Sequence, residues 1–404
     1  MEQSYQEQMH RRIYRQRISV SCVFLCITLF AILGVLPIVP DIIVKVLKPI
    51  YILICIAFYG GGYYRIGFEK WLIFLLSYLL LILLTNIQGN GSISVYASML
   101  LFAIFYFYAG LRIWNPLEIR TILKTVMLAG FVCAIITFFS NGGSFSVGNS
   151  QHIYFLSKIR NRNSAAFSIA PGTVTSILLF FNEKKGVRSR MGYVAVFLVS
   201  YLMLIALSCR SAFLSATTGI FLIIWHAITV RVDTARRFFR RSLLLVFVYI
   251  TLIVLMRVVE GTSSARLFDY SNSGRDDLWK EAIDLIRAKP VFGGGFDYWS
   301  RTGHVTSPHN TFFSIMLISG YIGGILLVMM IFSMINECLR QKSIFALAFA
   351  MQMFFHSISE AGLDYYAYIP LILTSIVLRY SEYQQSDYAS IFFNPHRGRR
   401  RNTK

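Results

Sequence analysis

Residues 191–228 read MGYVAVFLVSYLMLIALSCRSAFLSATTGIFLIIWHAI. The stretch contains two apolar runs, and each approaches the roughly 20 residues that a helix needs to cross a bilayer. Little more than Ser208, Cys209 and Arg210 separates them. Two such runs with so short a connection predict a pair of membrane-spanning helices joined by a tight turn. Similar runs recur along the chain.

The composition of the whole chain also favours a membrane setting. Hydrophobic residues make up 56% of the 404 residues and charged residues only 14%, whereas soluble domains average roughly a quarter charged. So few charges cannot cover a water-exposed surface, and we therefore expect the bilayer to be the solvent. Because the apolar runs are short and closely spaced, we expect residues 1–404 to form a single polytopic membrane domain.

The apolar runs predict an all-α polytopic membrane protein with about 12 transmembrane helices. The predicted spans begin near Ser19, Val44, Trp71, Ile93, Thr121, Ser164, Met191, Ser211, Ser242, Thr311, Ser343 and Tyr366.

The basic residues predict the orientation. The formal charge is +20, but the Lys and Arg residues lie in short clusters between apolar runs. This is the pattern of the positive-inside rule, and it argues against nucleic acid as a partner. With both termini in the cytoplasm, the larger share of the 39 Lys and Arg residues lies inside, including the clusters at 184–190, 231–241 and 397–404. The six cysteines lie in or beside apolar runs and have no metal-binding spacing.

Two outward connections are long, one at 140–163 and a larger one at 260–310. Within the larger loop, the segment 273–290 predicts an amphipathic helix, with Ser273 as its N-cap and Pro290 ending it. Its apolar stripe consists of Leu278, Ala282, Leu285 and Ile286. We expect this helix to lie at the membrane surface or to cap the helical bundle.

Arginines near the outer face are the first candidates for function. Arg210 lies at or just below that face, where a charged side chain usually marks a function or a specific partner. The alternative is that it reaches the lipid headgroups. Arg275 begins the amphipathic helix, where a guanidinium beside free backbone N–H groups suits a phosphate. The alternative there is a local ion pair with Asp276 or Asp277.

Arg160 and Arg162 precede the sixth span, and Asn163 lies at its boundary. The outer arginines therefore gather near one face and suit a ligand with concentrated negative charge, such as a pyrophosphate. Glu360 and Asp364 are the nearest acids from the C-terminal half. They either orient arginines, bind sugar hydroxyls or form structural pairs.

His309 opens the tenth span, and Pro308 and Asn310 suit a turn into a helix N-terminus. An imidazole can accept a proton near neutral pH, so His309 is a candidate base. The alternative is a structural histidine at a helix start. As a metal pair, His304 and His309 lack an evident third ligand, so we predict neither a metal nor a cofactor.

Three segments resemble, in order and spacing, the bacterial O-antigen ligase and O-antigen polymerase superfamily. They are SCRSAF (208–213), GRDDLWKEAIDLIRAKPVFGGGF (274–296) and PHNTFFSIMLISGYIGG (308–324). RNRNSAAF (160–167) is a weaker fourth match, in which Asn163 corresponds to an asparagine at the start of a span. The ordered set runs from about Arg160 to Gly324, and the twelve-span plan extends the likeness to the whole chain.

The resemblance implies a metal-independent glycosyltransferase of the GT-C-like class in the bacterial inner membrane, with residues 260–310 as a periplasmic loop. The implied donor is an oligosaccharide on undecaprenyl pyrophosphate, and the acceptor is a glycan or the lipid A core. By this analogy Arg210 and Arg275 hold the pyrophosphate, and His309 activates or orients the acceptor hydroxyl. The implied substrate-binding residues are Arg160, Arg162, Asn163, Trp279 and Asn310.

Polymerase and ligase share these motifs and differ in their acceptors. We favour a polymerase because polymerases are the more numerous and varied, which is an argument by analogy. Membrane lipids and a chain-length regulator are the further partners that we expect. A transporter or flippase for a lipid-linked glycan is the alternative of another class, and it predicts charges near the bilayer midplane. A non-catalytic scaffold predicts that replacing His309 leaves the glycan unchanged.

Overall fold

The computed structural model of the chain describes residues 63–64, 69–87, 110–114, 116–140, 152–155, 158–182, 186–229, 275–304, 308–359 and 369–385, with isolated positions between 236 and 246.

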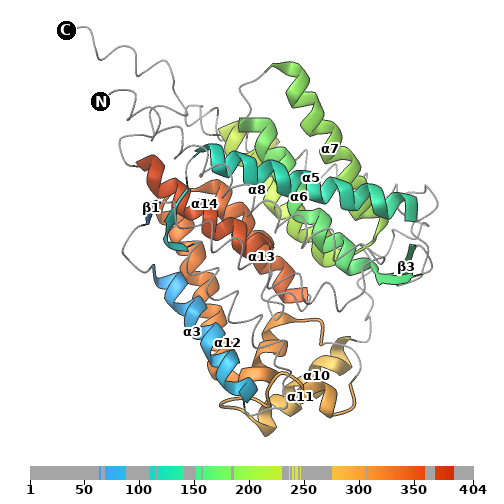
Figure 1. The fold of residues 1–404 in the computed structure, drawn as a ribbon, viewed down its shortest axis with the longest axis vertical. Coiled ribbons are helices and arrows are strands. Elements are labelled where there is room, and N and C mark those ends of the chain that lie inside the picture. Colours follow the sequence, from blue (N-terminus) through green and yellow to red (C-terminus); the bar gives the residue numbers. More distant parts are fainter. Residues whose placement is uncertain are drawn as a thin grey trace, which may run out of the picture.

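Helices form most of this part of the chain (Figure 1). Five are long and apolar enough to cross a membrane: α5 (Pro116–Ser140), α6 (Arg162–Asn182), α7 (Val187–Ala206), α8 (Arg210–Thr229) and α12 (Thr311–Arg340). Three more contain shorter apolar stretches: α3 (Lys70–Ile87), α13 (Ile344–Ser359) and α14 (Ile369–Gln385). The remaining two are α10 (Arg275–Ala288) and the single turn α11 (Tyr298–Arg301).

The predicted spans can be compared with these helices one by one. An apolar helix begins within a few residues of the predicted starts near Trp71, Thr121, Ser164, Met191, Ser211, Thr311, Ser343 and Tyr366. The starts predicted near Ser19, Val44 and Ile93 lie outside the described residues, and the region after Ser242 is described only at isolated positions. The helical membrane architecture is therefore confirmed, whereas the total of about 12 spans stays a prediction.

Two short antiparallel ribbons accompany the helices and were not predicted by the all-α interpretation. β1 (Tyr63–Tyr64) pairs with β2 (Arg112–Ile113), and β3 (His152–Phe155) pairs with β4 (Lys158–Asn161). The second ribbon lies in the connection at 140–163 and leads directly into α6. In that ribbon Ile153 is the register partner of Arg160. Aromatic and β-branched residues in so short a segment favour a strand only weakly, and the segment was therefore predicted to be a loop.

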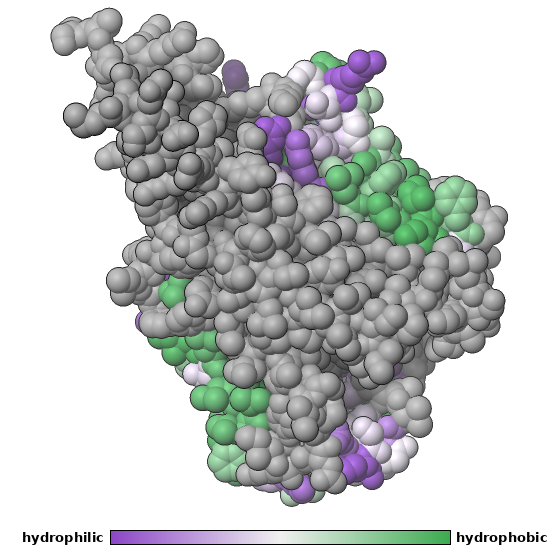
Figure 2. All heavy atoms as spheres, in the orientation of Figure 1, coloured by the Kyte–Doolittle hydropathy of each residue, from purple (hydrophilic) through white to green (hydrophobic). Residues whose placement is uncertain are grey.

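Apolar side chains cover the sides of the bundle. Exposed examples are Ile73 and Leu80 on α3 and Met191 and Leu198 on α7. Figure 2 shows apolar surface on the side of α5 and α7 and again on the side of α3. In water such a surface would be unfavourable, but it suits contact with lipid chains.

Small residues bring α5 and α6 close together. A Cβ atom built on Gly130 would lie 2.8 Å from the Cα of Gly172, and the reverse distance is also 2.8 Å. Glycine at both positions therefore lets the two backbones touch. Membrane helices commonly pack in this way, because lipid gives them no hydrophobic driving force to associate.

α12 is bent about a third of the way along its length, at Ser319 and Gly320. Ser319 (φ −130°) and Gly320 (φ +67°) leave the helical conformation, and the positive φ at Gly320 favours glycine. At the bend, the backbone carbonyls just before it no longer accept the N–H groups four residues later in the helix. Leaving these carbonyls without a hydrogen bond away from water would cost free energy.

The turn that follows α10 supplies the missing partners. The N–H groups of Gly294 and Gly295 donate to the carbonyls of Leu317 and Ile318, at 2.8 and 3.0 Å. In return, the N–H of Tyr321 donates to the carbonyl of Pro290 at 2.7 Å. The Gly-rich turn and the bend in α12 are thus joined backbone to backbone.

α10 lies against the first half of α12. Ala282 and Ile286 are buried with Trp299 and Leu317, and Leu278 and Leu285 pack around them. The predicted apolar stripe is confirmed, and it faces protein rather than lipid. The helix ends at Ala288, close to Pro290 as predicted, whereas the predicted N-cap Ser273 lies outside the described residues.

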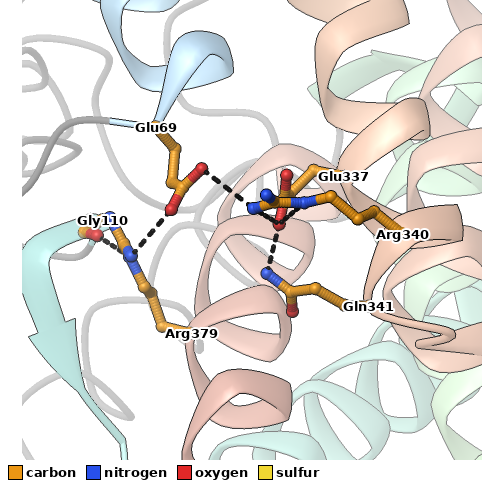
Figure 3. Close-up of polar contacts among 6 residues, drawn as sticks. All are labelled: Glu69, Gly110, Glu337, Arg340, Gln341 and Arg379. Atoms are coloured by element: carbon orange, nitrogen blue, oxygen red, sulfur yellow. Dashed lines mark hydrogen bonds and ion pairs between the residues drawn. The ribbon is translucent and has the colours of Figure 1, made fainter.

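Charged side chains fasten α3, α12 and α14 at the other end of α12 (Figure 3). Glu69 lies 3.7 Å from Nη1 of Arg379 and 3.6 Å from Nη2 of Arg340. Arg340 also pairs with Glu337 at 2.7 Å. The Arg379 side chain is 1% exposed and also donates to the carbonyl of Gly110.

Candidate functional site

α8 and α13 run antiparallel. A Cβ atom on Gly219 would lie 3.3 Å from the carbonyl oxygen of Ala348. Further along α8, the ring of His226 is centred 6.4 Å from that of Phe345. A later position on α8 thus meets an earlier position on α13, so the start of α8 lies at the level of the end of α13.

α6 runs in the same direction as α8. The Cβ position at Gly219 is also 3.2 Å from the side chain of Val174, which puts these two residues at one level. Nearer the start of α6, the ring of Phe167 is centred 3.8 Å from that of His356, in the last turns of α13. The starts of α6 and α8 therefore gather at the end where α13 finishes.

α12 begins at this same end. The side-chain amide of Asn310, directly before α12, donates to the carbonyl of Ile358 at 2.8 Å. The beginnings of α6, α8 and α12 therefore share one end of the bundle. Three predicted site residues lie there, namely Asn163 in the first turn of α6, Arg210 as the first residue of α8, and His309 before α12.

His309 and Asn310 form the turn into α12 that the sequence predicts. His309 has φ +50°, in the left-handed region, and is half-buried. Asn310 is extended and caps the helix, because its Oδ1 accepts the N–H groups of Phe312 and Phe313 at 2.9 and 3.1 Å. Both the oxygen and the nitrogen of the Asn310 side-chain amide are thus hydrogen-bonded to protein groups.

α10 brings two predicted residues to this turn. The indole N–H of Trp279 donates to the carbonyl of Pro308 at 2.9 Å, and the Trp279 ring is centred 5.8 Å from that of Phe313. Arg275 lies four residues before Trp279 and so shares its face of the helix. Arg275 and Arg210 are each half-buried, and each interacts with other protein groups.

His304 lies apart from this turn and packs within the α10–α11 unit. Its Nδ1 is 3.4 Å from Oε2 of Glu281, and its ring stacks on Trp299 with centroids 4.0 Å apart. These contacts explain His304 as a structural residue. Among the residues that the structure describes, no group of three or more His, Cys, Asp or Glu could hold a metal ion.

The side chains of four further predicted residues are not described. Glu360 and Asp364 follow the end of α13 and are not described. Arg160 belongs to β4 and Arg162 begins α6, but their side chains are not described.

Two features of this end could not be predicted from the sequence. One is the carbonyl of Ile358, which anchors Asn310 but carries no sequence signal. The other is the contact between the Gly-rich turn and the bend at Gly320. The glycines on both sides of this contact stand in two of the motifs that carry the family resemblance. Nothing in the sequence, however, indicates that these two motifs contact each other.

One comparison with known proteins identifies this region. A family model described as O-antigen ligase matches residues 188–328. The matched segment includes most of α7, all of α8, α10 and α11, and α12 to beyond its bend. No curated protein matches the chain. Residues 188–328 therefore match the O-antigen ligase family, in agreement with the resemblance to the O-antigen ligase and polymerase superfamily, and the apolar helices indicate a multi-pass membrane protein.

Proposed function

We propose that this protein polymerises the repeat units of a surface polysaccharide, such as O-antigen, capsule or exopolysaccharide. The donor is a glycan on undecaprenyl pyrophosphate, and the acceptor is a sugar hydroxyl at the periplasmic face. The observation that carries the proposal is the meeting of helix ends within the family domain. Arg210, Arg275 and His309 belong to three separate elements that converge at one end of the bundle.

The two arginines of this proposal bind the diphosphate of the donor. Arg210 approaches from the start of α8 and Arg275 from the start of α10. Guanidinium groups match phosphate oxygens geometrically and carry a fixed positive charge. They stabilise the negative charge that grows on undecaprenyl pyrophosphate as it leaves, an effect for which one preorganised donor is worth roughly a hundredfold in rate. The reaction in this proposal needs no metal.

His309 acts on the acceptor. The acceptor oxygen attacks the anomeric carbon, the bond from that carbon to the diphosphate oxygen breaks, and the hydroxyl proton passes to the imidazole of His309. A single displacement of this kind inverts the anomeric configuration. Asn310 supports His309, and Arg160, Arg162 and Asn163 bind the donor from the start of α6.

The proposed topology follows from the distribution of basic residues. Both termini are cytoplasmic, about 12 helices span the inner membrane, and residues 260–310 form a periplasmic loop that covers the site. α10 in this loop acts as a lid. Its packing on α12 supports this role, because a helix fixed to the bundle can hold Arg275 over a lipid-borne diphosphate.

A ligase that transfers the finished polymer to lipid A core is the second candidate, favoured by the description of the matched family. The surface glycan of a deletion strain, separated on a gel, distinguishes the two. A single repeat unit retained on the core supports the polymerase, and unlinked polymer on the lipid carrier supports the ligase. An unchanged glycan ladder contradicts both. The family match gives no support to a flippase.

A further inference from the structure

The backbone of His309 is held in an unusual conformation. Its φ of +50° lies in the left-handed region, which costs a residue with a side chain about 1 kcal/mol or more. Histidine is among the residues that adopt this region more often than most. The conformation persists only if neighbouring groups hold the peptide units on both sides of His309.

The peptide unit after His309 is held by Asn310. Asn310 is the N-cap of α12, with its Oδ1 accepting two backbone N–H groups. Its Nδ2 is anchored on the carbonyl of Ile358. Residue 310 therefore cannot rotate without releasing three hydrogen bonds.

The peptide unit before His309 is held by Trp279. That unit consists of the carbonyl of Pro308 and the N–H of His309, and its carbonyl accepts the indole N–H at 2.9 Å. Pro308 is buried. The φ angle of His309 is the rotation about the bond between its backbone nitrogen, which belongs to this peptide unit, and its Cα atom. Trp279 thus fixes one side of the rotation while Asn310 fixes the other.

Trp279 is itself firmly placed. Its helix α10 buries Ala282 and Ile286 against α12. Beyond that helix, the Gly-rich turn is bonded to the bend of α12 through Gly294 and Gly295. Since the indole has a single donor, and that donor is used on Pro308, the polar atom of Trp279 serves the protein.

We propose that Trp279 is a positioning residue, which sets the direction of the His309 imidazole by holding the carbonyl of Pro308. This inference rests on the proposed role of His309 in glycan transfer. It changes the substrate-binding role that the resemblance implies for Trp279. In Trp279→Phe the ring remains and the donor is lost, so the peptide unit before His309 can relax towards a less strained φ and carry the imidazole away.

The test is a comparison of two variants of the full-length protein in reconstituted membranes. Trp279→Phe removes the indole in question, and Trp299→Phe makes the same chemical change within the same α10–α11 unit. The donor is the lipid-linked glycan extracted from membranes of a deletion strain. Turnover is normalised to the amount of folded protein, and kcat and KM for the donor are measured separately.

We expect Trp279→Phe to lower kcat about tenfold, the size of one lost hydrogen bond, without changing the KM for the donor. Trp299→Phe should leave the normalised kcat within about twofold of the parent. A kcat of Trp279→Phe that also stays within twofold overturns the inference. An increased KM at unchanged kcat overturns it as well, because it assigns Trp279 to substrate binding. His309→Ala with parental turnover instead contradicts the proposed function itself.

Discussion

Gly293 and Gly320 face each other backbone to backbone where the turn after α10 meets the bend of α12. A Cβ atom on Gly293 would lie 2.5 Å from the carbonyl carbon of Ile318, and one on Gly320 would lie 2.2 Å from the carbonyl oxygen of Val291. Both glycines have a positive φ, +69° and +67°. Any side chain at either position would separate the turn from the helix.

Gly320→Ala should therefore destabilise the protein strongly. The new methyl group meets backbone atoms that cannot move aside alone, and φ +67° is itself unfavourable for alanine. We expect a loss of folded protein or a marked fall in the thermal unfolding temperature in detergent.

Gly303→Ala is the matched control for Gly320→Ala. Gly303 also has a positive φ, +92°, but a Cβ atom there would meet nothing within 4 Å. Gly303→Ala therefore has the unfavourable positive φ angle of Gly320→Ala but no steric clash of the new methyl group. If both variants lost the same stability, the backbone contact between the turn and the bend would not be the cause.

Gly130→Val should weaken the packing of α5 on α6, because the added atoms would enter space that the backbone of Gly172 fills. Overpacking of this kind costs about 1–3 kcal/mol. The thermal unfolding temperature of the purified protein measures the effect. Gly192→Val on α7, where a Cβ atom meets nothing within 4 Å, should be close to neutral. Equal losses in the two variants would contradict a specific α5–α6 contact.

Asn310→Asp should separate the two functions of this side chain. The aspartate keeps an oxygen that caps α12 but loses the donor to the carbonyl of Ile358. We expect the variant to stay folded and to lose turnover, because the start of α12 is released from α13. Asn310→Ala loses the cap as well and should cost about 1 kcal/mol more in stability. A turnover of Asn310→Asp equal to that of the parent would show that the tie to Ile358 is dispensable.

Glu69→Gln should destabilise the end of the bundle opposite to α10. It removes the carboxylate that lies 3.7 Å from the guanidinium of Arg379, a side chain that is 1% exposed. Breaking a buried pair in this way costs on the order of 3 kcal/mol.

The exposed pair of Arg287 and Asp284, 70% and 73% exposed, serves as a control for the buried pair. Asp284→Asn should change stability by less than about 0.5 kcal/mol, since water screens exposed charges. A loss for Glu69→Gln that is no larger than this would contradict a stabilising role for the network in Figure 3.

The apolar helices that the structure describes could be predicted largely from sequence, because a bilayer demands long apolar segments whatever their neighbours are. The cap at Asn310 was also predictable, since helix starts depend on a few adjacent residues. The bend at Gly320 was not. It forms because the carbonyls of Leu317 and Ile318 accept N–H groups from Gly294 and Gly295, which are more than twenty residues earlier in the chain.

The candidate site shows the same division. Arg210, Arg275 and His309 stand out in the sequence because charged or titratable groups are rare beside apolar runs. The supporting contacts do not. The bond from Trp279 to Pro308 depends on how α10 packs on α12, and the anchor of Asn310 on Ile358 depends on how α12 meets α13.

The most direct test of the proposed function is turnover of the extracted lipid-linked glycan by Arg210→Ala, with Arg188→Ala as the control. Arg188 is exposed at the start of α7, at the end of the bundle away from Arg210. We predict that Arg210→Ala loses about a hundredfold or more in kcat while Arg188→Ala keeps the parental rate. Parental turnover by folded Arg210→Ala would contradict the proposed binding of the donor diphosphate by Arg210.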